Sequence, residues 1–157
     1  MNEANRRLNL APATEAKVGW AQVGQHEVWI EPDSGFVCET VRGSMTTAEM
    51  LEISKMAIRL ARDADPNAAF YLVDARAQKT MAGQDRRKVM AELAAISSSE
   101  NYVAVFGGNL VSRTFASVVF KGIAKLTNKF LGYYAAGESD ARIWLAERRR
   151  AYLARPR

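Results

Sequence analysis

The chain has 157 residues, of which 48% are hydrophobic and 25% charged, and its formal net charge is +5. This length is sufficient for one domain with a buried core, and the composition is that of a folded globular protein. The single cysteine excludes an internal disulfide framework and favours a reducing compartment, so we expect a cytoplasmic protein. No apolar run approaches the ~20 residues of a membrane-spanning helix, and residues 1–17 lack the apolar segment of a secretory signal.

The domain organisation is expected to be simple. Residues 1–15 are polar and should form a mobile N-terminal arm. Residues 16–154 contain no repeat, low-complexity tract or linker, and their structural patterns follow one another with short connections. This segment is therefore predicted to be a single domain.

Strand patterns come first in the chain. Residues 18–30 are rich in strand-forming apolar residues, with an interruption at residues 24–26, and residues 36–41 continue the pattern after a turn at residues 32–35. Strands joined by so short a turn must be antiparallel, so a hairpin should form one edge of the sheet. His26 is the only histidine, and it falls in the polar interruption, so we interpret it as a surface turn residue.

The strongest helix signal follows this hairpin. Thr46 and Glu49 have the spacing of a capping box, apolar residues then recur at helical spacing, and Asp65 before Pro66 ends the helix. Residues 69–73 come next and are apolar throughout, which is typical of a strand buried on both faces of a parallel sheet. This strand is predicted to stop at Asp74.

Helix and strand patterns alternate over the rest of the chain. The predicted elements are a helix near 83–97, a strand at 102–106, a helix near 112–128, a strand at 131–135 and a helix at 139–153. The resulting order is β-β-α-β-α-β-α-β-α. It predicts an α/β fold with right-handed crossovers and a mostly parallel sheet that has an antiparallel edge hairpin.

This order resembles the STAS domain, and within that family the SpoIIAA-like branch, which is linked to the Sec14 lipid-transfer fold. The resemblance covers about residues 18–153. It depends on the strand end at 71–74 (Tyr-Leu-Val-Asp), the strand at 102–106, and residues 141–145 (Ala-Arg-Ile-Trp-Leu), which look like the Ala-x-x-Trp-Leu ending common in the branch. It implies a SpoIIAA-like fold, a regulatory or protein-interaction role and self-association as a homodimer. The Sec14 kinship implies a lipid or other apolar ligand between the sheet and the third helix.

The family's phosphorylation motif is altered in this chain. Anti-sigma-factor antagonists of the family begin the helix after this strand with Asp-Ser-Ser-Gly, and one serine is phosphorylated. The corresponding stretch here is Thr80-Met81-Ala82-Gly83, which keeps the glycine and lacks the serines. We therefore expect no phospho-serine switch. Thr80 is interpreted as the helix cap, with a role as substitute phosphate acceptor as the alternative.

A group of charged residues around this junction is the first candidate contact surface. Its cations lie near a helix N-terminus, where the helix dipole favours anions. This arrangement indicates a site for an anion or an acidic partner, and a solvated helix face is the alternative. Asp74 has a second explanation, because a short carboxylate often accepts backbone N–H groups of the following loop. The candidate partner-binding residues are Asp74, Arg76, Lys79, Thr80, Arg86, Arg87 and Lys88.

The third predicted helix carries the second candidate surface. Its cations lie at four- and eight-residue steps, opposite an apolar stripe. Such a helix suits an anionic membrane surface, or it is a packed crossover helix with a solvated basic side. The candidate residues are Arg113, Lys121, Lys125 and Lys129.

No motif in the sequence supports catalysis. The sequence has no second cysteine and no histidine near Cys38, which is interpreted as a packed thiol. Residues 107–109 (Gly-Gly-Asn) match no nucleotide fingerprint and are interpreted as a tight turn rather than a phosphate cradle, and Gly122 as a site of close helix packing on the sheet. We expect no enzyme activity, no metal, no cofactor and no nucleic acid. The expected function is a non-enzymatic regulatory or protein-interaction domain, and the alternative is binding of a lipid or other apolar ligand.

Overall fold

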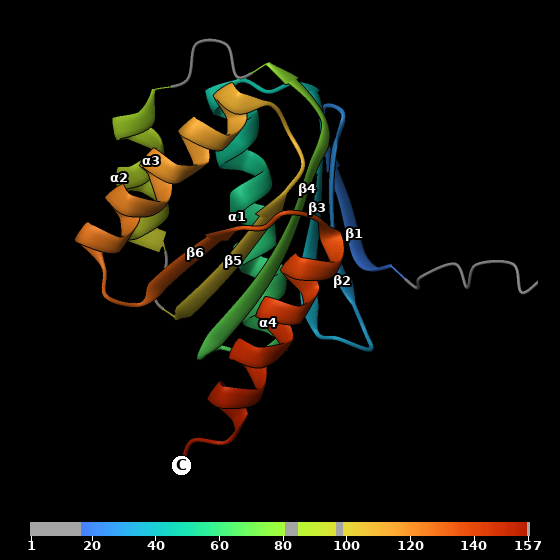
Figure 1. Cartoon of the computed structure of the whole chain (residues 1–157), viewed down its shortest axis with the longest axis vertical. Coiled ribbons are helices and arrows are strands. Elements are labelled where there is room, and N and C mark those ends of the chain that lie inside the picture. The colour runs from blue at the N-terminus through green and yellow to red at the C-terminus, as the bar shows by residue number, and fades with distance from the viewer. Residues whose placement is uncertain (1–16, 81–84, 97–98, 157) are drawn as a thin grey trace, which may run out of the picture.

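The computed structural model describes residues 17–80, 85–96 and 99–156. These residues form an α/β fold with one six-stranded mixed sheet and four helices (Figure 1). The elements in chain order are β1 (Val18–Val23), β2 (His26–Glu31), β3 (Phe36–Ser44), α1 (Thr47–Ala64), β4 (Ala68–Thr80), α2 (Arg86–Ile96), β5 (Glu100–Phe106), α3 (Leu110–Leu126), β6 (Phe130–Tyr134) and α4 (Glu138–Leu153). The predicted mobile arm at residues 1–15 and the motif positions 81–83 lie outside the described residues.

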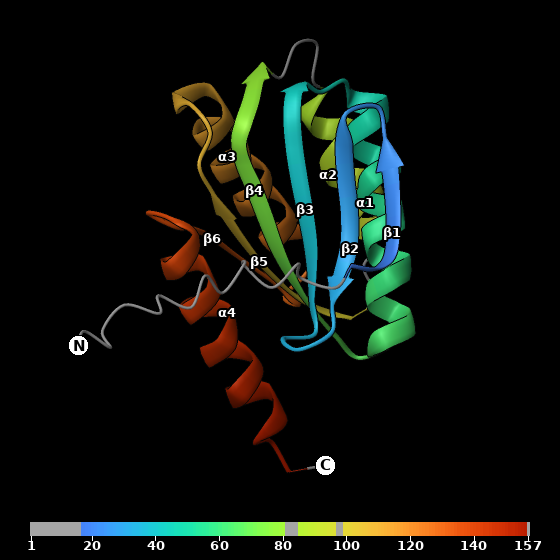
Figure 2. The ribbon, with the colours of Figure 1, turned by 90° about the vertical axis from the view of Figure 1, so that its right-hand side faces the viewer.

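The strands follow one another across the sheet in chain order, from β1 to β6. The pairs β1–β2 and β2–β3 are antiparallel, and the pairs from β3 to β6 are parallel. The predicted α/β class with a parallel region and an antiparallel edge is thereby confirmed. Each parallel crossover is right-handed and moves in the same direction, so the connecting helices fall on one face of the sheet. Figure 2 shows α4 on the opposite side of the sheet from α1, α2 and α3.

The start of the chain differs from the prediction, because residues 18–30 form two strands and not one. Gly24 takes φ +56°, which allows a tight turn, and Val23 pairs directly with His26 across it. His26 is therefore not a surface turn residue: it begins β2 and is only 1% exposed. Its Nδ1 accepts a hydrogen bond from the backbone N–H of Arg42 at 3.2 Å, and its Nε2 lies 3.8 Å from a carboxylate oxygen of Glu49.

The prediction was also wrong about the length of the strand that begins near residue 69, which is β4 in the structure. β4 does not stop at Asp74 but continues to Thr80, because the second half of β3 runs beside it and pairs Arg42 with Ala77. Thr80 ends this strand and does not cap a helix. Its hydroxyl lies 2.7 Å from the hydroxyl of Ser44. At the start of α2, Asp85 accepts a hydrogen bond from the backbone N–H of Lys88 at 3.1 Å, as a capping residue does.

The helix α1 begins as predicted. The Thr46 side chain accepts from the Glu49 backbone, and the Glu49 side chain accepts from the Thr46 backbone at 2.8 Å, which completes the capping box. Asp65 forms the C-cap before the proline. None of the four helices is apolar over a length that could cross a bilayer, as far as the described residues extend.

The helices on the first face differ in how they meet the sheet. α1 packs on the strands near the antiparallel edge and α3 packs on β6, whereas α2 packs on α1 and α3. Gly122 serves the contact between α2 and α3, since a Cβ at this position would lie 1.8 Å from Sδ of Met90. The predicted role of Gly122 in packing on the sheet is therefore corrected to packing on α2. This arrangement leaves a space between the sheet and the helices.

Candidate functional site

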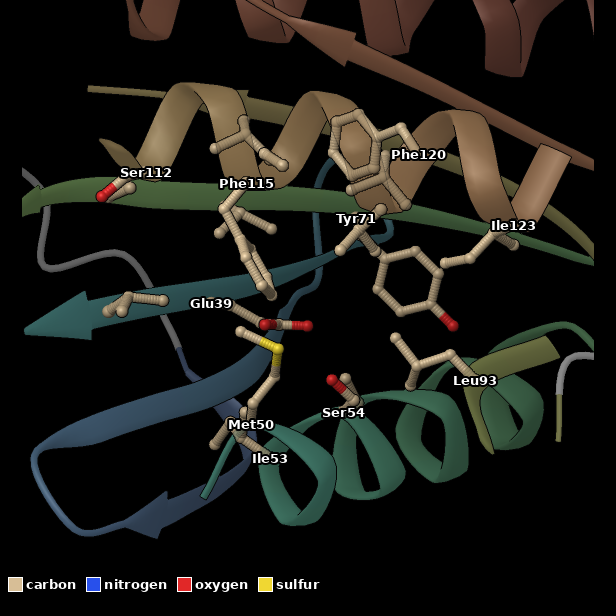
Figure 3. Close-up of a pocket in the computed structure, with 18 of the residues that line it drawn as sticks. Glu39, Met50, Ile53, Ser54, Tyr71, Leu93, Ser112, Phe115, Phe120 and Ile123 are labelled. Atoms are coloured by element: carbon tan, nitrogen blue, oxygen red, sulfur yellow. The ribbon is translucent and has the colours of Figure 1, made fainter. Parts of the chain in front are cut away.

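A cavity of about 180 Å³ lies between this face of the sheet and the helices α1 and α3 (Figure 3). Its floor consists of alternate residues of the central strands, since successive side chains of a strand point to opposite faces. Tyr71 of β4 and Val103 of β5 belong to this floor. Ile53 of α1 and Phe115 of α3 form opposite walls, and Leu93 of α2 also lines the space. The lining is mostly apolar and partly aromatic.

Small side chains on the helices keep this space open. Ser54 and Ala57 of α1 and Ala116 of α3 all line the cavity. Larger aliphatic residues at these positions would extend into the space and fill it. The helices are held apart from the floor by longer side chains such as Met50 and Phe115, which Figure 3 shows pointing into the cavity.

Glu39 is the one acidic residue among the described residues that line the cavity. It lies on β3 between Val37 and Val41, and these three side chains share the face that is covered by the helices. Figure 3 shows its carboxyl group inside the cavity, next to Met50 and Phe115. Within the described part of the chain, no lysine, arginine or histidine lines the cavity.

The environment of Glu39 disfavours its charge. Protein atoms surround the side chain, and burial raises the pKa of Glu39 to about 7. No hydrogen bond to its carboxyl group is found among the described residues, and the residue keeps an intermediate exposure and lines the cavity. Burial also raises the pKa of Tyr71, and the charge of Glu39 raises it further. Glu39 is therefore a buried carboxyl group whose polar atoms are available to a ligand.

Three other polar groups of the lining are engaged with the protein. The Ser112 hydroxyl lies 3.2 Å from Oδ1 of Asn109, and the Asn101 amide donates to the Ser99 carbonyl at 2.8 Å. The Tyr134 hydroxyl donates to the Gly107 carbonyl. These residues stabilise the loops at the ends of the cavity, and Glu39 is distinguished from them by its lack of such a partner.

The predicted partner-binding residues Asp74 and Arg76 form an ion pair with each other. The Arg76 guanidinium donates to both Asp74 oxygens, at 3.0 and 2.7 Å, and the Arg76 backbone N–H donates to Oδ1 at 3.0 Å. Burial would raise the pKa of Asp74, but these hydrogen bonds outweigh it and hold the pKa below its usual value. Arg76 also lies 3.7 Å from Glu138 and its guanidinium lies 5.2 Å from the Phe106 ring centre, so this pair is on the α4 side of the sheet.

The other members of that predicted surface lie elsewhere. Arg87 and Lys88 are exposed on α2, which is on the opposite side of the sheet from α4 (Figure 1), and Arg86 is the first residue of the same helix. Lys79 and Thr80 are exposed at the end of β4. The structure therefore does not bring the seven residues together on one face.

The predicted basic residues of α3 are exposed. Arg113, Lys121 and Lys125 lie on the solvated side of the helix, and Lys129 follows its end. The Arg113 guanidinium lies 4.9 Å from the Tyr134 ring centre, and the Lys129 carbonyl accepts from the Asn101 backbone at 2.7 Å. The opposite side of α3 packs inward and lines the cavity, so α3 is a packed crossover helix with a basic outer side.

Two further predictions concern possible sites of chemistry. Gly107 and Gly108 take φ +78° and +77°, and a Cβ on Gly107 would lie 2.7 Å from the backbone nitrogen of Arg76, so this loop is a tight turn. Cys38 is a buried, packed thiol. Over residues 17–80, 85–96 and 99–156, no three histidine, cysteine, aspartate or glutamate residues are grouped so as to hold a metal ion.

Sequence reasoning missed Glu39. The signal was present, because Glu39 alternates with two valines in a strand, and this pattern directs its carboxyl group to the apolar face. No family model, no curated protein and no solved structure matches the chain. The fold and the site define an α/β protein with an internal apolar cavity and one buried carboxyl group in it.

Proposed function

We propose that this protein binds a small apolar ligand in the cavity between the sheet and the helices α1, α2 and α3. The observation that carries this proposal is the cavity of about 180 Å³ with its apolar and aromatic lining. Protein interiors are close-packed and contain few voids larger than a water molecule. An apolar cavity of ~150 Å³ in another protein stays dry and takes up benzene or xenon.

The energetic cost of the cavity supports a binding role. At ~24 cal/mol per Å³, an unfilled space of 180 Å³ costs at most about 4 kcal/mol of stability. This cost is a large fraction of the 5–15 kcal/mol that stabilises a typical domain. Larger side chains at Ala57 or Ala116 would reduce it, so the small residues at these positions suit a space that a ligand occupies.

The protein-interaction function is less well supported by the geometry. Its charged residues lie on both sides of the sheet, with Arg76 next to α4 and Arg87 and Lys88 on α2. Binding of an apolar ligand is the function that the kinship of the SpoIIAA-like branch with Sec14 also implies. We propose that the fold belongs to this branch, and the mixed sheet with its antiparallel edge supports that assignment.

Methionine methyl groups offer a direct test. In protein labelled with ¹³C at the methionine methyls, titration with toluene should shift the resonances of Met45 and Met50, which line the cavity, in a saturable manner. Met56 of α1 does not line the cavity and should shift much less. Mass spectrometry of the solvent-extracted protein would identify a co-purifying ligand.

Matched variants of α3 provide the control. Ala116→Leu places additional carbon atoms in the cavity and should weaken toluene binding, whereas Ala124→Leu makes the same change at an exposed position of the same helix and should have no effect. Absence of saturable shifts in the wild-type protein would refute the proposal, as would equal toluene binding by both variants and the wild type.

A further inference from the structure

Glu39 gives the cavity a specific chemical character. We propose that the ligand is a small amphipathic amine, with an apolar or aromatic body and one cationic nitrogen that pairs with the Glu39 carboxylate. This inference depends on the proposed function, because it names the ligand class of the same cavity.

The position of Glu39 is the first observation. Its carboxyl group lies inside the mostly apolar cavity, and no described residue donates a hydrogen bond to it. A buried carboxylate without a partner is unfavourable, and a partner of opposite charge relieves that cost. A ligand with an ammonium group would supply both the charge and the hydrogen-bond donors that the protein does not provide.

The charges of the lining favour a cationic ligand over the other ligand classes. An anionic ligand such as a fatty acid would meet no lysine, arginine or histidine among the described lining residues, and its carboxylate would be repelled by Glu39. A neutral hydrocarbon fits the cavity but leaves Glu39 without a partner. An alcohol would form a hydrogen bond, which is weaker than the charge-assisted bond of an ammonium group.

The aromatic residues of the lining favour the same ligand class. Tyr71, Phe115 and Phe120 all contribute to the cavity wall, and Figure 3 shows them around one space together with Glu39. The faces of aromatic rings attract cations, most strongly where water is excluded. The rings also offer stacking surfaces to an aromatic ligand body.

Proton linkage provides a signature of this binding mode. Burial raises the pKa of Glu39 to about 7 in the empty cavity, and an ammonium partner would lower it, so an amine binds the ionised form. The affinity for an amine that stays protonated should therefore rise about 30-fold between pH 5.5 and pH 8. The other titratable groups of the described lining are Tyr71 and Tyr134, whose pKa values are raised, so both stay neutral in this range.

The test compares three ligands of similar size: 2-phenylethylamine, 2-phenylethanol and 3-phenylpropionate. At pH 8 the wild-type protein should bind the amine at least tenfold more tightly than the alcohol, and the acid most weakly. Glu39→Gln should lower amine affinity at least tenfold, remove its pH dependence and leave alcohol binding unchanged. Glu52→Gln removes an exposed carboxylate of α1 and should behave as wild type.

Toluene separates the possible failures. If toluene binds but the amine binds no more tightly than the alcohol, the amine proposal is wrong and the proposed function remains. If toluene and all three ligands fail to bind, both are wrong. If Glu39→Gln loses toluene binding, its cavity has collapsed and the variant is not informative about the amine. The preference of the wild-type protein for the amine over the alcohol, and the pH dependence of amine binding, then test the amine proposal.

Discussion

Replacement of Glu39 by glutamine should stabilise the ligand-free protein in a pH-dependent manner. Burial raises the pKa of Glu39 from its ordinary value of 4.5 to about 7 in the folded protein. Between these two pH values, the folded state holds a proton that the unfolded state has already released. The free energy of unfolding of the wild-type protein therefore falls as the pH rises through this window.

The size of the effect follows from the same two pKa values. The rise of the pKa from 4.5 to about 7 corresponds to about 3 kcal/mol. Glutamine has the shape of the carboxyl group without its charge, so the variant does not incur this loss. Relative to the wild type, the stability of Glu39→Gln should rise by about 3 kcal/mol from pH 4 to pH 8.5.

Urea denaturation followed by tryptophan fluorescence measures this difference at each pH. Other titrating groups are present in both proteins and cancel in the comparison. His26 is the most important of these, because burial lowers its pKa and its contribution to stability is lost as the pH falls below 6.5, the opposite direction to Glu39. The control Glu52→Gln should show a constant difference from the wild type. A constant difference for Glu39→Gln as well would refute the reasoning.

Two further predictions concern packing and ion pairing. Gly122→Ala should destabilise the wild-type protein by about 1–3 kcal/mol, because its Cβ would overlap with Met90. In a Met90→Ala background the same change should stabilise the protein, since only the helix preference for alanine remains. Thermal unfolding of the wild type, the two single variants and the double variant tests this, and equal effects of Gly122→Ala in both backgrounds would contradict it. Arg142 donates to both oxygens of the buried Glu31 at 3.0 Å, so Arg142→Ala should cost about 3–5 kcal/mol at pH 7. Burial alone would raise the pKa of Glu31, but the hydrogen bonds from Arg142 and Ser34 keep it below 4.5. The difference in stability between the wild type and Arg142→Ala should therefore shrink as the pH falls below 4.5. A difference that does not change in acid would exclude this ion pair as its cause.

The parts of the fold that were predicted correctly depend on local sequence. The capping box at Thr46 and Glu49 and the stop at Asp65 are complete within a few residues, and the boundaries of α3 and β6 lie within three residues of their predicted positions. Local chemistry determines such features, because the interacting groups are close in the chain. The class of the sheet followed from the alternation of helix and strand patterns.

The parts that were missed depend on residues far apart in the chain. β4 continues beyond Asp74 only because β3 runs beside it, and its polar residues resemble a loop when the partner strand is not considered. His26 is buried because Arg42 on another strand donates to its ring. In both cases the partner lies outside the local segment. The polar residues of that segment, considered alone, therefore predicted solvent exposure.

The candidate site shows the same division. The alternation around Glu39 is local and could have identified a carboxyl group on an apolar face. The cavity could not be predicted in this way, since its volume is the difference between the space that two layers enclose and the side chains that fill it. The separation of the predicted charged residues was missed for a similar reason. Arg76 and Arg87 lie on opposite sides of the sheet, and this could be recognised only once the end of β4 was known.

The cavity and the buried carboxyl group impose two separate costs on the empty protein. The unfilled space accounts for at most about 4 kcal/mol and the charge of Glu39 for about 3 kcal/mol at alkaline pH. A neutral apolar ligand relieves only the first, whereas an amine relieves both. Ligand binding raises the free energy of unfolding in proportion to the logarithm of ligand concentration over Kd. At equal concentration and pH 8, an amine should therefore raise the melting temperature more than its alcohol analogue, and at pH 5.5, where Glu39 is protonated, this advantage should largely disappear.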